Sequence, residues 1–163
     1  MPITINGNGT ITGVTGGLNR PAFRVQLNTT TVITNATNTV VPFNVVGIDT
    51  DNCFDTSNYT VTPNVAGFYV VFANITVTTA QKPNLEDSQL YIFKNNSLIA
   101  FAEIDPNDNE EEGVLTNQTG TVVEMNGTSD FFQVKVFIDR QTSAAQIVGG
   151  NRQSFFYGYK LNI

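Results

Sequence analysis

The chain has 163 residues and a formal net charge of −6 at pH 7, and 40% of its residues are hydrophobic while only 13% are charged. This length suits one domain with a core of its own, and the hydrophobic share excludes wholesale disorder. The eight Lys and Arg residues are scattered along the chain and form no basic stripe, which argues against a nucleic-acid-binding protein.

Residue usage favours strands and turns over helices. Thr and Asn together make up about a quarter of the chain, and they suit pleated strands and left-handed turn positions respectively. No window repeats apolar residues at helical spacing over three turns. We therefore predict an all-β fold. No apolar run reaches the roughly 18 residues of a membrane-spanning helix, and we expect no secretory signal at the N-terminus, so neither a membrane nor a secreted location is predicted.

Residues 1–20 differ in composition from the rest, with Gly, Asn and Thr dominating and Ile or Val occurring singly. Such a segment cannot bury much apolar surface by itself. We expect residues 1–20 to be an extended N-terminal arm that attaches to a partner chain or a neighbouring subunit. Residues 21–163 are expected to form the folded domain.

From residue 21 onward, β-prone runs alternate with turn clusters about every ten residues, which is typical of an antiparallel sandwich. The predicted strands are Ala22–Asn28, Val40–Val46, Tyr59–Thr62, Gly67–Thr78, Gln89–Lys94, Leu98–Phe101, Gly120–Met125, Phe131–Asp139 and Ser154–Ile163. Tight turns are predicted at Asn95-Asn96 and Asn126-Gly127.

The strand predicted over Gly67–Thr78 is apolar on both faces. Its two faces are Phe68, Val70 and Phe72 on one side, and Tyr69, Val71, Ala73, Ile75 and Val77 on the other. Antiparallel sheets usually leave one face to water. Leaving three or four large apolar side chains exposed loses about 1.5–3 kcal/mol of burial free energy for each side chain. We predict that another copy of the chain covers the second face, and the alternative is a long loop of the same chain.

Two other predicted strands each have one wholly apolar face and one mixed face. Ser154–Ile163 places Phe155, Tyr157 and Tyr159 on one side and Phe156, Gly158 and Lys160 on the other. Phe131–Asp139 places Phe132, Val134, Val136 and Ile138 on one side and Phe131, Gln133, Lys135 and Phe137 on the other.

Several motifs, in order, resemble the C1q-like globular domains and their tumour necrosis factor relatives. These motifs are Val41-Pro42-Phe43, Phe54-Asp55, Tyr59, Thr62, Pro63, Gly67-Phe68-Tyr69, LYIFKNNSLIA at 90–100, GTVVEMNGTSDFFQVKVF at 120–137 and the closing SFFYGYKLNI. The resemblance covers residues 22–163 and departs from the family at Val71, where a Phe is usual. It implies an antiparallel two-sheet jelly-roll sandwich that assembles as a homotrimer, with one sheet of each subunit at the threefold axis.

The arm resembles a different group of proteins. TINGNGTITGVTGG is similar to the leaders of small virion proteins of tailed phages, especially those of cyanobacterial hosts. In those proteins the leader attaches a C-terminal module to the particle. This resemblance implies a virion protein that is made in the host cytoplasm.

No catalytic, cofactor-binding or metal-binding residue is predicted. The chain has no histidine, which excludes His-dependent nucleophile triads and His-ligated metals. Cys53 is alone, and we expect it to be a small structural residue near a strand start. The acidic run EIDPNDNEEE at 103–112 is interpreted as a solvated loop, with a calcium site as the open alternative.

Three functions compete, and none of them is enzymatic. The first is a trimeric capsid decoration, or cement, protein whose residues 1–20 bind the major capsid protein or another virion protein. The second is the receptor-binding tip of a phage tail or head fibre, with loops 103–112 and 141–153 contacting a host surface receptor. The third, a secreted cellular C1q-like domain, is disfavoured because a collagen-like stalk is missing.

Overall fold

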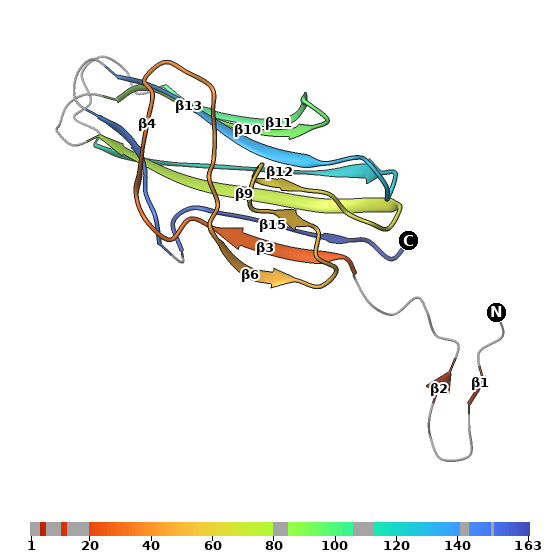
Figure 1. Ribbon diagram of the computed structural model, residues 1–163. Helices are drawn as coiled ribbons and strands as arrows, with labels where there is room; N and C mark the ends of the chain where they lie inside the picture. Colours follow the sequence, from red (N-terminus) through yellow and green to blue (C-terminus); the bar gives the residue numbers. More distant parts are fainter. Residues whose placement is uncertain are drawn as a thin grey trace.

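The computed structural model describes residues 4–5, 11–12, 20–79, 85–105, 113–140, 144–150 and 152–163. Over these residues the chain forms strands and no helix, as the composition predicts. The strands pair antiparallel throughout and build two large sheets that pack face to face (Figure 1). Within the described part, no helix is long and apolar enough to cross a membrane.

The first sheet has seven strands centred on β9. In hydrogen-bonded order they are β4 (Thr31–Ile33), β14 (Ala145–Ile147), β9 (Gly67–Thr79), β15 (Phe155–Lys160), β3 (Ala22–Gln26) and β6 (Val45–Asp49), with β12 (Val114–Met125) on the other edge of β9. β9 therefore lies in the middle of the sheet, and its backbone is paired on both sides.

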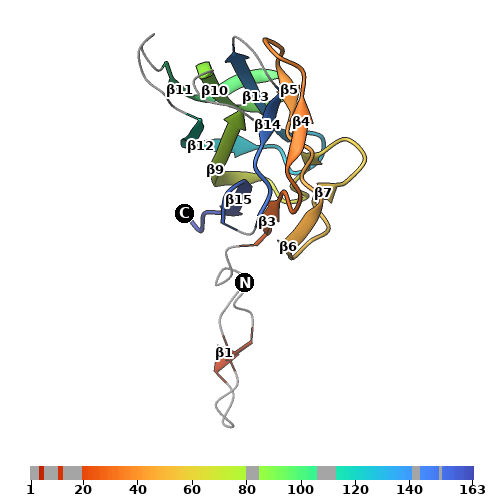
Figure 2. The same ribbon diagram turned by 90° about the vertical axis from the view of Figure 1, so that its left-hand side faces the viewer.

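The second sheet has six strands. Its order is β11 (Ser97–Ile104), β10 (Leu85–Lys94), β13 (Phe132–Arg140), β8 (Thr60–Val61) and β7 (Phe54–Asp55), with β5 (Thr39–Val40) also paired to β13. In Figure 2 the strands β10, β11 and β13 lie above β9, β15 and β3, so the two layers of the sandwich can be told apart.

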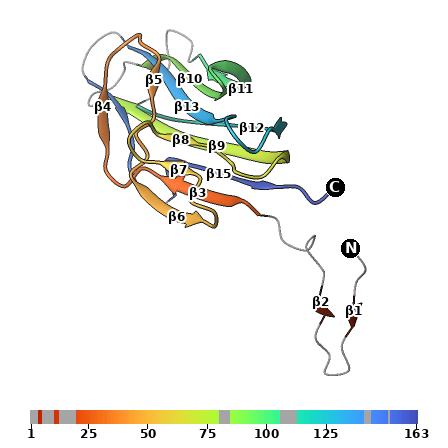
Figure 3. The same ribbon diagram turned by 45° about the vertical axis from the view of Figure 1, so that its right-hand side comes forward.

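Residues 4–5 and 11–12 of the predicted arm form β1 (Thr4–Ile5) and β2 (Ile11–Thr12), which pair antiparallel with each other (Figure 3). Among the described residues, neither strand joins the two large sheets. The rest of residues 1–19 lies outside the described part, so an attachment role for this segment stays a prediction.

The core lies between the sheets and follows the alternation of the strands. In β9, Tyr69, Val71, Ala73, Ile75 and Val77 are fully buried, and the apolar face predicted for β13 is buried opposite them. Phe23, Phe132 and Phe156 contact one another, with ring centroids 5.0–6.4 Å apart. Each sheet thus supplies one apolar face to a shared core, which is what holds a sandwich together.

Both predicted turns are present, with different geometry. Asn95 and Asn96 have φ angles of 49° and 65°, which is the left-handed pair that a two-residue hairpin between β10 and β11 requires. The second turn is longer. The Oδ1 atom of Asn126 accepts hydrogen bonds from the backbone amides of Thr128, Ser129 and Asp130 at 2.9–3.0 Å.

The single strand predicted over Val40–Val46 is wrong. β5 ends at Val40 and β6 begins at Val45, because the intervening residues cross from one sheet to the other. The amide of Val41 donates to Val134 in the six-stranded sheet, and the amide of Asn44 donates to Gln26 in the seven-stranded sheet. Pro42, which has no amide hydrogen to donate, sits at this crossing. The short strands β4, β7 and β14 were not predicted.

Candidate self-association surface

The outer face of the seven-stranded sheet carries the second apolar face predicted for β9. Phe68, Val70 and Phe72 point away from the core, whereas their neighbours Tyr69 and Val71 are fully buried. Phe68 remains 41% exposed, so this side of β9 faces solvent in the single chain. We call the uncovered apolar residues on β9, β12 and β15 the outer patch.

The strands on either side of β9 extend the patch through their register. On β12, Gly120 lies opposite Phe72 and Val122 lies opposite Val70. On β15, Tyr157 lies opposite Phe72 and Tyr159 lies opposite Val70. Cross-strand neighbours in an antiparallel sheet have adjacent side chains. The patch is therefore continuous over three strands. Val122 is 56% exposed, which is more than the 41% of Phe68.

Gly120 makes a depression at the centre of the outer patch. A hollow of about 400 Å³ is lined by Val70, Phe72, Val122 and Tyr157 around this glycine. A Cβ atom at position 120 would lie 2.7 Å from the Val71 carbonyl oxygen and 3.0 Å from Cδ2 of Phe72. The missing side chain therefore lets the Phe72 ring lie over β12, and it leaves a concave apolar surface.

Aromatic rings continue from this depression along β15. Phe72 lies 5.5 Å from Tyr157 and 6.5 Å from Phe155 between ring centroids, and Phe155 lies 6.2 Å from Tyr157. The Arg24 guanidinium carbon lies 5.2 Å from the centroid of Phe155, in a cation–π arrangement. The wholly apolar face predicted for this strand is thus the outward one, and the core receives Phe156 and Gly158 instead.

The other half of the same sheet face is polar, and the chain itself covers it. Asn74 and Thr76 are buried although they point outward on β9. The carbonyl oxygen of Gln153 accepts hydrogen bonds from Nδ2 of Asn74 at 2.6 Å and from Oγ1 of Thr76 at 3.1 Å. The connection between β14 and β15 therefore covers this end, while the Phe68–Phe72 end stays uncovered. The alternative prediction, that a loop of the same chain covers the second face of β9, is therefore confirmed only for the polar half of that face.

Glu124, the β12 residue opposite Phe68, lies at one end of the patch, whereas Lys160, opposite the buried Tyr69 on β15, lies on the other face of the sheet. The Cε atom of Lys160 would lie 2.7 Å from a Cβ atom at Gly67, so the lysine stem packs against that glycine. A surface that is apolar in the middle and charged at its end is the usual anatomy of a protein interface.

The structure leaves the predicted acidic run mostly outside the described residues. Only Glu103, Ile104 and Asp105 of residues 103–112 are described, as are residues 144–150 and 152–153 of the predicted contact loop 141–153. Among the described residues, no group of three or more His, Cys, Asp or Glu side chains is arranged to hold a metal ion. Cys53 is buried and free directly before β7, as predicted, and burial raises the pKa of its thiol.

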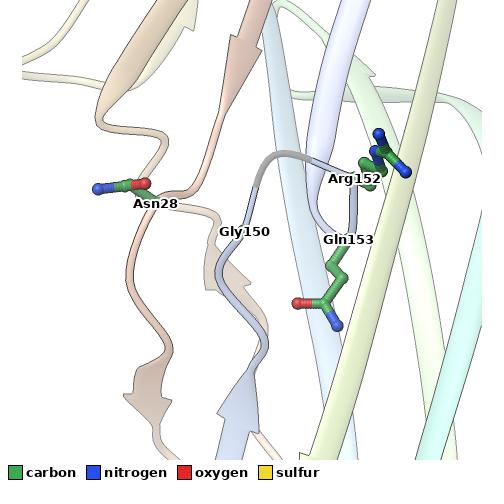
Figure 4. Close-up of a pocket in the computed structure, with 4 residues that line it drawn as sticks. All are labelled: Asn28, Gly150, Arg152 and Gln153. Atoms are coloured by element: carbon green, nitrogen blue, oxygen red, sulfur yellow. The ribbon is translucent and has the colours of Figure 1, made fainter.

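A second hollow, of about 520 Å³, is lined by Asn28, Gly150, Arg152 and Gln153. Figure 4 shows that the Asn28, Arg152 and Gln153 side chains point in different directions and do not converge on one point. A ligand site needs a few polar groups aimed at the same place. This hollow therefore carries no binding site by its geometry.

The alternation of residues 67–78 predicted that β9 is apolar on both faces, but two other contributors to the outer patch were not predicted. Gly120 gives no apolar signal, although its position opposite Phe72 creates the depression. The outward direction of Tyr157 was hidden because both faces of its strand carry aromatic residues. Gly120 could have been identified from the sequence, because a glycine within a β-strand often marks the close approach of a neighbouring segment.

No protein-family model matches the chain, and no curated protein matches its sequence. Solved structures do resemble it. The Eiger TNF of S. frugiperda superimposes with a TM-score of 0.64 at 11% identity, over 86% of this chain and 91% of that one. The globular domain of zebrafish complement 1qA protein gives 0.59 at 18% identity, over 86% and 96%. Murine APRIL gives 0.64 at 10% identity, over 86% and 98%.

These likenesses show the fold. The domain is an antiparallel two-sheet jelly roll of the tumour necrosis factor and C1q type, as the motifs predicted.

Proposed function

We propose that the chain is a non-enzymatic structural protein of a tailed-phage virion. In this proposal it forms a homotrimer that decorates the capsid, and residues 1–20 anchor it to the major capsid protein or to another virion protein. The chain is then made in the host cytoplasm and works as part of the particle.

The observation that carries the proposal is the uncovered outer patch. Phe68 on β9 and Val122 on β12 are 41% and 56% exposed, while Tyr69, Val71, Ala73, Ile75 and Val77 on the opposite face of β9 are fully buried. A contiguous apolar patch of this kind usually marks an interface. The resembled family places one sheet of each subunit at a threefold axis, and the patch lies on the corresponding outer sheet face. A trimer is therefore the assembly that we propose.

The virion role is supported by the N-terminal segment. Its Gly-, Asn- and Thr-rich sequence resembles the leaders of phage virion proteins, and its strands β1 and β2 pair with each other. Strands in such a short pair still have edge amides and carbonyls that are free to bond a further strand. We propose that the segment binds the particle by main-chain pairing, which needs few side chains.

The proposal is tested by adding purified protein to capsids that lack it. The full chain is expected to bind at saturating, symmetric occupancy, seen by electron microscopy as threefold densities. A variant that lacks residues 2–20 is expected to keep its circular dichroism and its assembly state but to leave the capsids bare. Full occupancy by the truncated variant would contradict the role of the arm, and absence of binding by the full chain would contradict the decoration role.

The alternative is the receptor-binding tip of a tail or head fibre. One observation favours it, namely a set of outward aromatic side chains on the six-stranded sheet, at Tyr91, Phe93 and Phe101. Copy number separates the two functions, since dozens to hundreds of copies per particle indicate decoration and a few trimers indicate a fibre. Quantitative mass spectrometry of particles measures it.

A further inference from the structure

The outer face of the six-stranded sheet carries a second group of aromatic side chains that the proposed decoration role does not use. Tyr91 and Phe93 lie on the same side of β10, Phe101 lies opposite Tyr91 on β11, and Phe137 lies on β13 opposite Gln89. The residues that alternate with them, such as Leu90, Ile92 and Val136, are buried in the core. We call Tyr91, Phe93, Phe101 and Phe137 the aromatic platform.

The rings of the platform are arranged as neighbours. Tyr91 and Phe101 are stacked, with centroids 5.5 Å apart and an interplanar angle of 27°, and Tyr91 lies 6.0 Å from Phe93. Phe101 is 46% exposed and Leu98, opposite Phe93, is 51% exposed. Part of this ring surface is therefore open to solvent on a nearly continuous stretch of two strands.

Hydrogen-bonding groups border the platform on one end. Gln89 lies next to Tyr91 on the same side of β10, opposite Glu103. Its Nε2 atom donates to Glu103 at 2.8 Å and to Asp87 at 2.5 Å, and its Oε1 atom accepts from the Tyr91 hydroxyl. The network fixes the position of the Tyr91 ring and places carboxylate oxygens beside it.

No ion pair in the described part of the chain involves these two carboxylates. In the described part of the chain, the ion pairs are Arg20 with Asp51 and Lys94 with Asp130, and neither involves Asp87 or Glu103. The Oδ1 atom of Asp87 is buried and accepts no hydrogen bond there. Burial, and next the negative charge of Glu103, raise the pKa of Asp87. The exposed Glu103 carboxylate is therefore the acceptor that a ligand can reach at this border, whereas the unpaired Asp87 oxygen is buried.

Lys135 provides a hydrogen-bond donor beside the aromatic platform. It lies opposite Tyr91 on β13, and its Nζ atom lies 4.7 Å from the centroid of Phe93. The ammonium group therefore occupies the face of one ring while its remaining hydrogens stay available for acceptors.

From this arrangement we propose that the aromatic platform is a binding site for a neutral carbohydrate. A pyranose ring has one face of C–H groups, which packs on an aromatic ring, and an edge of hydroxyls. Those hydroxyls would donate to the exposed carboxylate of Glu103 and accept from Lys135. The two carboxylates oppose acidic sugars by charge repulsion. A cationic ligand is disfavoured because Lys135 already lies over the Phe93 ring.

The location keeps the platform apart from the outer patch. The platform faces outward from the six-stranded sheet, and the outer patch faces outward from the seven-stranded sheet on the far side of the core. In Figure 1, β10 and β11 lie above β12, β9 and β15. Carbohydrate binding therefore does not compete with self-association, and it does not depend on the proposed capsid role.

The test is saturation-transfer-difference NMR on the full chain with a panel of neutral oligosaccharides (gluco-, manno-, galacto-, xylo- and chito-oligosaccharides). Hexagalacturonate and sialyllactose are the acidic comparators, and an Arg-rich peptide is the cationic one. At least one neutral saccharide is expected to give saturation transfer through its C–H protons, and the acidic saccharides are expected to give none.

Two substitutions at one position supply the matched control. Phe101→Leu keeps an apolar side chain but removes the aromatic face, and it is expected to weaken binding of the responding saccharide about tenfold. Phe101→Tyr keeps the ring and is expected to bind as the wild type does. Glu103→Gln removes one negative charge and is expected to raise the signal from the acidic saccharides.

The proposal is wrong if no neutral saccharide responds, if Phe101→Leu binds as tightly as the wild type, or if the Arg-rich peptide alone binds. The molar mass of every sample is measured in parallel, so that a failure of self-association is recorded separately from a failure of carbohydrate binding.

Discussion

Replacing Val122 by lysine is expected to dissociate the assembly while leaving the domain folded. Val122 is 56% exposed on β12 beside Val70, so a lysine there projects into solvent in the isolated subunit. Complete burial of a valine side chain is worth about 1.5–3 kcal/mol, and since about half of Val122 is already covered, burial in an assembly adds about 1 kcal/mol per copy.

Three copies then lose about 3 kcal/mol of association free energy from apolar burial alone, which corresponds to more than about 100-fold in the dissociation constant. An ammonium group confined in that apolar surface without a partner costs several kcal/mol more per copy. The expected effect of Val122→Lys is therefore complete dissociation at micromolar concentration.

Light scattering coupled to size exclusion measures this effect, and urea unfolding checks the fold. Leu98→Lys is the matched control, because Leu98 is 51% exposed on the outer face of the other sheet. The control is expected to keep the wild-type mass. If Val122→Lys also keeps the wild-type mass with an unchanged unfolding transition, the outer patch is not the interface and the reasoning fails.

Two further predictions concern the stability of the domain. Gly127→Ala is expected to lower the free energy of unfolding in urea by about 1–3 kcal/mol, because φ at this position is +73° and a Cβ atom would lie 2.2 Å from the Ala66 amide nitrogen. Gly149→Ala is the control, because its Cβ atom would clash similarly with Thr29 but its φ is not positive. An equal loss in both variants would show that backbone strain at Gly127 adds nothing. The hydrogen bond from Lys94, followed by the hydrogen bond from Asn95, holds the pKa of Asp130 below its usual value. The folded state therefore gains stability above the ordinary aspartate pKa of about 4 and loses it as the pH falls through the lowered pKa. Lys94→Met is expected to flatten this dependence in urea titrations at several acidic pH values, and an unchanged slope would contradict the assignment.

Strand alternation was enough to predict the sandwich and the two apolar faces of β9, although not which of the two faces outward. Residues at alternate positions of β9 and β13 point the same way whatever the neighbours are, so their apolar faces could be assigned from the chain alone. Asn95-Asn96 and Asn126-Gly127 were predictable for a similar local reason, because Asn and Gly accept positive φ angles.

Other features depend on contacts between distant segments. Val41 and Asn44 separate β5 from β6 by bonding to different sheets, and the sequence of that segment does not record those partners. In β15 both faces carry aromatic residues, so only the partners Arg24 and Phe72 reveal that Tyr157 points outward. The partial cover of β9 by Gln153 likewise needs two segments 79 residues apart in the chain.

The aromatic platform was missed because its residues come from strands that the sequence places in separate runs. Tyr91 and Phe93 alternate with buried Leu90 and Ile92, which makes the run look like an ordinary buried strand. Only the pairing with Phe101, Glu103 and Lys135 gathers rings and polar groups on one surface.

Sedimentation equilibrium of the full chain from submicromolar to tens of micromolar concentration tests the central claim, self-association through the outer patch, most directly. One chain has a mass of 17.8 kDa. A homotrimer is expected to appear as a species of about 53 kDa that persists at the lowest concentrations measured. A single species at the mass of one chain throughout the range would contradict it.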